Sequence, residues 1–270
     1  MTQYITPLRK KLFLLLVPVL VGIVYLGGTV LSSSSKSPKG TVKINNLTHS
    51  CEILSAEKHN GHIKISFRNN NDKAITAYVF SNTEANDSYS VAEEFAFSEG
   101  DAVISPGQIY DKVIGIPAYL NRRDEVVFNL SAIMLEDSIG EGDPKIIRNI
   151  KDYRLGEKVQ LMKALPVIDK LLRLSDTEIP VHWDKTARHD FEVALDAPDT
   201  DWLIQLNKGP LNNHDPDNKS QFELGIQSGK EYVLRKHQEM KDMVELQGTA
   251  GMREDLTTLR DLYAKMIARL

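Results

Sequence analysis

Residues 61–68 read Gly-His-Ile-Lys-Ile-Ser-Phe-Arg, and apolar and polar side chains alternate along this stretch. In an extended chain, Ile63, Ile65 and Phe67 point to one face, and the polar residues between them point to the other. Residues 125–135 alternate in the same way. A strand that is apolar on one face has to cover that face with another layer. The pattern therefore predicts half-buried β-strands in a domain of two layers.

Further stretches of strand character surround these two, with turn residues between them. Asn69-Asn70-Asn71-Asp72 predicts a turn, and Ser105-Pro106-Gly107 places Pro and Gly at the two central positions of a type II turn. Short strands at this spacing are typical of an immunoglobulin-like antiparallel β-sandwich, which we expect over residues 41–137. The further strands are expected at residues 42–47, 51–56, 75–80 and 108–116.

The sequence changes from strand to helix character after the predicted sandwich. Asp143 followed by Pro144 predicts a helix N-terminus, because Asp is a common N-cap and Pro fits the first helical position. Apolar residues then recur at helical spacing, and Gly156 and Pro166 are expected to break or kink the helix. Residues 175–220 show no clear period, so no architecture is predicted for them.

The C-terminal part predicts an antiparallel helical hairpin. Apolar residues recur every three or four positions in two runs, 222–247 and 252–270, and a four-residue link with two glycines joins the runs. An isolated helix of about 19 residues, the length of the second run, is only marginally stable in water, so the apolar stripes have to be covered. We expect Leu259 of the second helix to face Val233 or Lys236 of the first.

A charge-free segment precedes the strands. Residues 12–31 are 20 consecutive residues without Asp, Glu, Lys, Arg or His, which is the length that a helix needs to cross a bilayer core of about 30 Å. Arg9, Lys10 and Lys11 come directly before it. The positive-inside rule then predicts a cytoplasmic N-terminus and an extracytoplasmic body. The membrane, bound through residues 12–31, is thus the first partner that the sequence predicts.

The alternative interpretation of this segment is a cleaved signal peptide, with a poor small-residue cleavage site at Val30 and Ser32. Signal peptides usually contain roughly 7–15 apolar residues, so the length favours an uncleaved, single-pass signal-anchor. A lipoprotein route is excluded, since the only cysteine is Cys51, well past the segment.

Composition restricts the location and the partners of the body. The chain has 33 Lys and Arg against 37 Asp and Glu, and three of the cations belong to the N-terminal tail. An acidic body without a basic cluster cannot neutralise phosphates well, which argues against nucleic acid as a partner. A single cysteine cannot form an internal disulfide, so a bacterial envelope, periplasmic or at the cell surface, is the more natural home.

These patterns divide the chain into four parts. The Ser-rich residues 32–40 are expected to form a flexible linker between anchor and body. The parts are residues 1–31 (cytoplasmic tail and transmembrane anchor), 32–40 (linker), 41–137 (sandwich) and 138–270 (helical region, with the hairpin at 220–270). The predicted fold class is α+β.

Several motifs between residues 42 and 175 resemble uncharacterised, signal-anchored bacterial cell-envelope proteins. The resemblance implies a sandwich followed by helices, and it implies no activity and no functional residues. The motifs are residues 63–77, Ile104-Ser-Pro-Gly107, the run Ala132-Ile-Met-Leu-Glu-Asp-Ser-Ile-Gly-Glu-Gly-Asp-Pro144, and Arg154-Leu-Gly-Glu-Lys-Val-Gln-Leu161.

Candidate metal ligands do not form a convincing set. The acidic loop from Asp137 to Asp143 could surround Ca²⁺, but an EF-hand reading puts Ile139 at the third position and Arg148 at the closing position. A strand-to-helix connection with Asp143 as the cap explains the loop better. The seven histidines are scattered without a His-x-x-x-His pair, and we expect them on the surface: His49, His59, His62, His182, His189, His214 and His237.

Nucleophilic catalysis also lacks a recognisable motif. Ser228 is the nearest candidate for a nucleophile elbow, but Ile226 and Lys230 occupy the places of its two glycines. Cys51 lies in an apolar strand without an obvious base and is expected to be buried and inert. The sequence therefore assigns no catalytic residue, no cofactor-binding residue and no metal ligand.

Two functions remain open on the sequence alone. The first is a membrane-anchored, non-enzymatic binding or assembly module with a protein partner. The alternative is an envelope hydrolase with a site assembled from residues 176–218, for which the available side chains are His182, Trp183, His189, His214 and Asp215. Convergence of two of these histidines with a carboxylate in a pocket would favour the enzyme.

Overall fold

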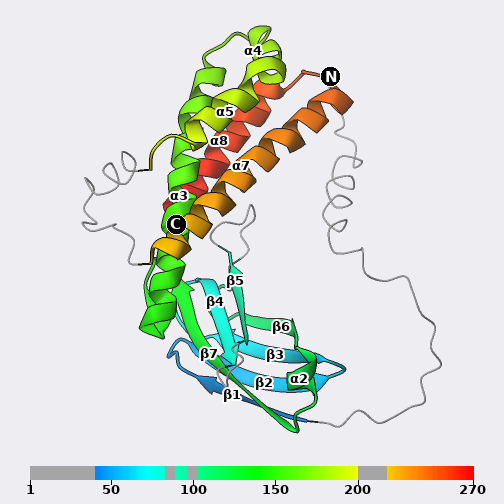
Figure 1. Ribbon diagram of the computed structural model, residues 1–270, viewed down its shortest axis with the longest axis vertical. Coiled ribbons are helices and arrows are strands. Elements are labelled where there is room, and N and C mark those ends of the chain that lie inside the picture. Colours follow the sequence, from blue (N-terminus) through cyan, green and yellow to red (C-terminus); the bar gives the residue numbers. More distant parts are fainter. Residues whose placement is uncertain (1–39, 83–88, 96–102, 200–217) are drawn as a thin grey trace, which may run out of the picture. The chain divides into compact units, whose positions relative to one another are not determined.

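A computed structural model describes residues 40–82, 89–95, 103–199 and 218–270, and the protein is α+β, with strands first and helices after them (Figure 1). The predicted anchor at residues 12–31 and nearly all of the linker lie outside these ranges. Within them, none of the helices combines the length and the apolar character that crossing a bilayer requires.

The strands form two sheets. In the first, β1 (Thr41–Asn46), β7 (Glu125–Leu135), β4 (Ile75–Asn82) and β5 (Tyr89–Glu94) are neighbours in that order, and β8 (Gly140–Gly142) pairs with β7. The second sheet has the order β2 (Cys51–His59), β3 (His62–Asn69) and β6 (Ile109–Gly115). β1 and β7 are parallel, whereas all other pairs are antiparallel, so the prediction of a purely antiparallel arrangement was wrong at one edge.

The two sheets share one hydrophobic core, as the alternation in residues 61–68 predicted. Ile63, Ile65 and Phe67 are fully buried, and the polar residues between them lie toward solvent. Phe67 of the second sheet packs against Tyr78 and Phe80 of the first, with ring centroids 5.3 and 5.8 Å apart. The expected strands are thus confirmed, and the apolar faces cover each other.

Two local predictions at the ends of strands are also confirmed. The Gln108 amide donates to the Ser105 carbonyl at 3.0 Å, and Gly107 has φ = +74°, as a type II turn requires. The Asp143 carboxylate accepts from the amides of Lys145 and Ile146 and caps the next helix. The acidic loop before this cap contains β8, so the strands continue to Gly142, beyond the predicted boundary at residue 137.

The first long helix, α3 (Pro144–Leu172), continues through Gly156 and Pro166, so of the expected break or kink the break was wrong. Gly156 serves a different purpose, because a Cβ atom there would lie 2.6 Å from the Ile226 amide nitrogen of the second long helix. The glycine therefore permits a close crossing of two helices instead of ending one.

Shorter helices follow α3 and complete one side of the helical region. α4 (Glu178–His182), the π-helical turn η1 (Trp183–Ala187) and α5 (Arg188–Leu195) form one continuous helical stretch.

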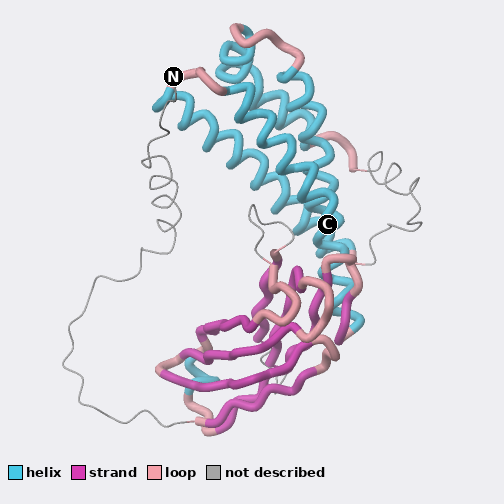
Figure 2. Tube along the Cα trace, turned by 180° about the vertical axis from the view of Figure 1, so that it is seen from behind, coloured by secondary structure: helices cyan, strands magenta, loops and turns pink. Residues whose placement is uncertain are grey.

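A short helix of the strand region, α2 (Ala118–Asn121), lies between β6 and β7. The tube in Figure 2 separates the strand-rich and the helix-rich parts of the chain.

The C-terminal helices α7 (Lys219–Gln247) and α8 (Met252–Arg269) are present as predicted and run in opposite directions (Figure 1). Leu259 and Val233 are buried in the same core cluster. However, α7 and α8 both pack mainly against α3 and not against each other. The apolar stripes that we expected to cover each other are therefore covered mostly by α3. Lys236 is partly exposed and belongs to no core cluster.

Candidate functional site

The described side chains of the predicted hydrolase set lie apart. The His182 ring contacts the Thr186 hydroxyl one turn later on the same helical stretch, whereas His189 lies exposed on α5. Trp183 is buried among apolar residues. His214 and Asp215 lie outside the described residues. No group of three or more potential metal ligands occurs in the described ranges.

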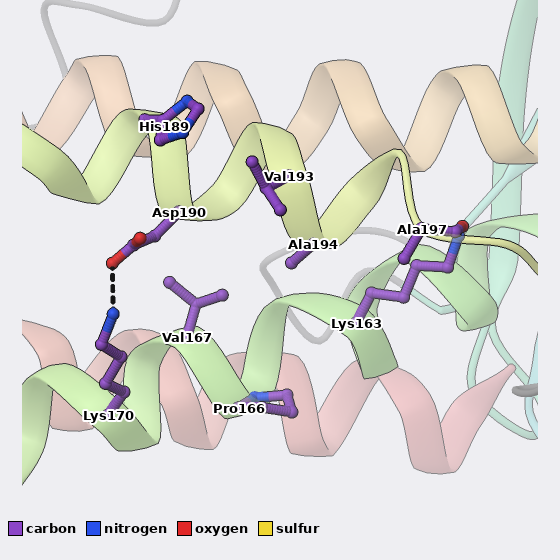
Figure 3. A pocket seen from close by; sticks show the side chains of 9 residues that line it. All are labelled: Lys163, Pro166, Val167, Lys170, His189, Asp190, Val193, Ala194 and Ala197. Atoms are coloured by element: carbon purple, nitrogen blue, oxygen red, sulfur yellow. Dashed lines mark hydrogen bonds and ion pairs between the residues drawn. The ribbon is translucent and has the colours of Figure 1, made fainter.

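A groove with a volume of about 440 Å³ lies between α3 and α5 at the surface of the helical region (Figure 3). Pro166 and Val167 of α3 face Val193 and Ala194 of α5 across it. Val193 keeps 58% of its surface exposed. The complete lining is Lys163, Pro166, Val167, Lys170, His189, Asp190, Val193, Ala194 and Ala197.

The charged groups along the groove are already paired. Lys170 Nζ lies 2.8 Å from Asp190 Oδ2, so this pair joins the two walls (Figure 3). Lys163 is buried and donates to the Leu195 and Ala197 carbonyls at 3.2 and 2.6 Å, and it also pairs with Asp199. A lysine at the C-terminal end of α5 suits the negative end of the helix dipole. The groove is therefore apolar inside and nearly neutral at its edges.

A second polar group lies where α3 crosses α7. Small residues four apart let helix backbones approach, and a Cβ atom on Gly229 would lie 2.8 Å from the Gln160 Cβ. At this crossing the Ser228 hydroxyl donates to Glu157 Oε1 at 3.0 Å. Burial, and then the nearby Glu94 carboxylate, raise the pKa of Glu157 to about 8. Ser228 thus has a carboxylate partner that its sequence motif did not indicate.

Arg154 connects the helices with the strands. Its guanidinium donates to both carboxylate oxygens of Glu94 on β5, at 2.9 and 2.7 Å, and to the Thr76 hydroxyl on β4 at 2.9 Å. Bidentate pairing of this kind fixes geometry as well as energy. Arg154 and Glu94 therefore hold the first third of α3 against the first sheet.

The expectation of surface histidines was wrong for His237. This residue of α7 is 3% exposed, and its ring stacks on Trp183 of η1 with centroids 4.5 Å apart. Burial, with help from Arg188 and Lys241, lowers the pKa of His237 to about 4. The apolar neighbours at helical spacing on α7 are the sequence signal that could have placed it inside.

Cys51 matches its prediction. The thiol is 5% exposed, and burial raises its pKa to about 12, so the thiolate that reacts with oxidants and electrophiles is not formed at neutral pH.

Comparisons with protein-family models, with curated proteins and with solved structures gave no match to this chain. The resemblance to signal-anchored envelope proteins stays a prediction.

Proposed function

We propose that this chain is a single-pass membrane protein of the cell envelope and that its body binds another protein in the groove between α3 and α5. Residues 12–31 would anchor it, with the N-terminus in the cytoplasm and residues 40–270 on the other side. The charge-free length of the segment and the three cations before it support this orientation.

In this proposal the strand region (residues 41–142) is an immunoglobulin-like sandwich that carries the helical region (residues 143–270). The two sheets and their common core support the sandwich architecture of this proposal. The strand order is distinct, since β2 and β3 are neighbours in one sheet, whereas the second and third strands of constant-type immunoglobulin domains lie in opposite sheets.

The observation that carries the binding proposal is the apolar, charge-paired groove with Val193 at its edge. Exposed valines occur elsewhere, as Val181 on α4 is 55% exposed, but Val181 does not line the groove. A groove lined by Pro, Val and Ala side chains accepts one or two apolar side chains from an amphipathic segment of a partner. The paired lysines leave little net charge for a nucleic acid or a phosphate to recognise.

Site-specific photocross-linking tests this function. A photoreactive amino acid is placed at residue 193 or, as the matched control, at residue 181 of the full chain in intact cells. We expect a discrete protein adduct from position 193 and little from position 181. Ala194→Arg, which fills the groove, should remove the adduct from position 193. Equal adducts at both positions, or an adduct that survives Ala194→Arg, would contradict binding in the groove.

A further inference from the structure

His237 occupies an unusual place on the inner face of α7. Its ring lies between Trp183 of η1, with an interplanar angle of 23°, and Phe191 of α5, whose centroid is 5.8 Å away at 70°. Neither ring nitrogen has a hydrogen-bond partner among the described residues, and the same holds for the indole nitrogen of Trp183. Two aromatic rings, from η1 and α5, thus enclose an imidazole of α7 that water does not reach.

This environment tolerates a neutral imidazole far better than a charged one. A neutral ring has one N–H donor and one acceptor nitrogen, whereas the protonated ring has two N–H donors and a positive charge. In this environment neither donor finds an acceptor, and the charge is cut off from water. The face of Trp183 attracts cations, but it offers no acceptor to either N–H group. Protonation is therefore favourable only if the ring reaches water.

The charged groups around the ring reinforce this preference. Arg188 of α5 and Lys241 of α7 both oppose a positive charge on His237, and Glu192 of α5 favours it to a smaller extent. Asp184 of η1 lies 3.8 Å from Lys241 and partly balances that cation. The sum of these charges, together with burial, favours the neutral form of the ring.

We infer that protonation of His237 releases η1 and α5 from α7, so that the helical region loosens in mild acid and closes again at neutral pH. α5 also forms one wall of the groove with α3, so the same protonation would alter the groove. The inference concerns the docking of η1 and α5 and holds whether or not a protein binds in the groove.

The two pKa values of His237, docked and released, determine how strongly pH shifts the balance between the docked and the released state. A solvent-exposed histidine titrates near 6.5, and the docked residue titrates at about 4. The docked state is fully favoured above pH 6.5 and loses its advantage as the pH falls toward 4. At pH 5 the ratio of released to docked protein should rise about 20-fold over its value at pH 7.

The fluorescence of Trp183 tests this inference in the full chain in detergent micelles. The chain has two tryptophans, so Trp202→Phe leaves Trp183 as the reporter. We expect a reversible shift of its emission to longer wavelength with a midpoint between pH 6.5 and 4. His237→Phe should remove this transition, whereas His189→Phe, at an exposed position of α5, should keep it.

Two results would overturn the inference: constant emission down to pH 4, or the same midpoint in His237→Phe as in the parent. If His237→Phe does not fold at neutral pH, an NMR titration of the histidine rings in the parent decides. A pKa of His237 well below 6.5 supports the switch, and a pKa at or above 6.5 contradicts it.

Discussion

The strand region and the helical region have interiors of different kinds. The core of the strand region consists mainly of aliphatic and aromatic side chains from both sheets, such as Phe67, Phe80 and Phe128. The helical region buries charged and polar side chains together with its apolar core, among them Glu157, Lys163 and His237. The strand region also buries polar side chains, such as Asn69 and Ser81, but these are uncharged and depend on hydrogen bonds only, whereas the charged groups of the helical region depend also on ion pairing and on protonation.

The buried polar groups of the helical region differ in how well they are satisfied. Arg154 and Lys163 have carboxylate or carbonyl partners. Glu157 Oε2 and both polar atoms of the Gln160 side chain have none among the described residues. We therefore expect the strand region to respond to changes in side-chain volume and the helical region to respond also to pH.

The largest effect is expected in the core of the strand region. Phe67→Ala should lower the free energy of unfolding by about 3–5 kcal/mol, since it removes a fully buried ring and leaves a cavity. Lys64→Ala, on the opposite face of β3, should change it by less than about 0.5 kcal/mol, because its ion pair with Asp111 is exposed. Chemical denaturation measures both, and similar losses would contradict the assignment of faces.

A smaller loss is expected at the crossing of α3 and α7. Gly225→Ala places a Cβ atom against the Tyr153 carbonyl oxygen, so the two helices have to move apart. Alanine favours helix by about 1 kcal/mol over glycine, but overpacking costs about 1–3 kcal/mol, so we expect net destabilisation. Gln227→Ala, exposed on the same helix, is the matched control. A Gly225→Ala variant at least as stable as the parent would exclude the close crossing.

The pH dependence of stability should reveal Glu157. Its pKa in the folded protein, about 8, lies above the ordinary value of 4.5, so the folded state holds the proton more tightly than the unfolded state. The contribution to stability is complete below pH 4.5 and decreases as the pH rises toward 8, by at most about 1.4 kcal/mol per pH unit. Glu157→Gln should remove this slope. The free energy of unfolding, measured at several pH values, gives this slope. The same slope in Glu157→Gln and in the parent would contradict the burial of this carboxyl.

Local patterns were sufficient for much of the strand region. Alternation placed β3 and β7, and the Pro-Gly pair placed the turn before β6, because each depends on neighbours in the sequence. β5 was missed, since its residues Tyr89–Glu94 alternate only weakly at the edge of a sheet. The parallel pairing of β1 with β7 depends on contacts between residues about 80 positions apart, which periodicity does not encode.

The candidate sites were harder to predict for a physical reason. On α3, Arg154, Glu157 and Lys163 are polar residues that an amphipathic pattern assigns to the solvent face, but α7, β5 and the end of α5 cover them. The groove likewise exists only because α5 packs beside α3. A single sequence does not indicate which polar face another helix will cover.

The most direct test of the proposed anchoring uses the single native cysteine as its own control. Leu246 is 84% exposed near the end of α7, whereas Cys51 is buried with a raised pKa. In intact bacterial spheroplasts, a membrane-impermeant maleimide should label Leu246→Cys and leave the parent chain unlabelled. Labelling of Leu246→Cys only after the cells are lysed would place the body in the cytoplasm and contradict the proposed function.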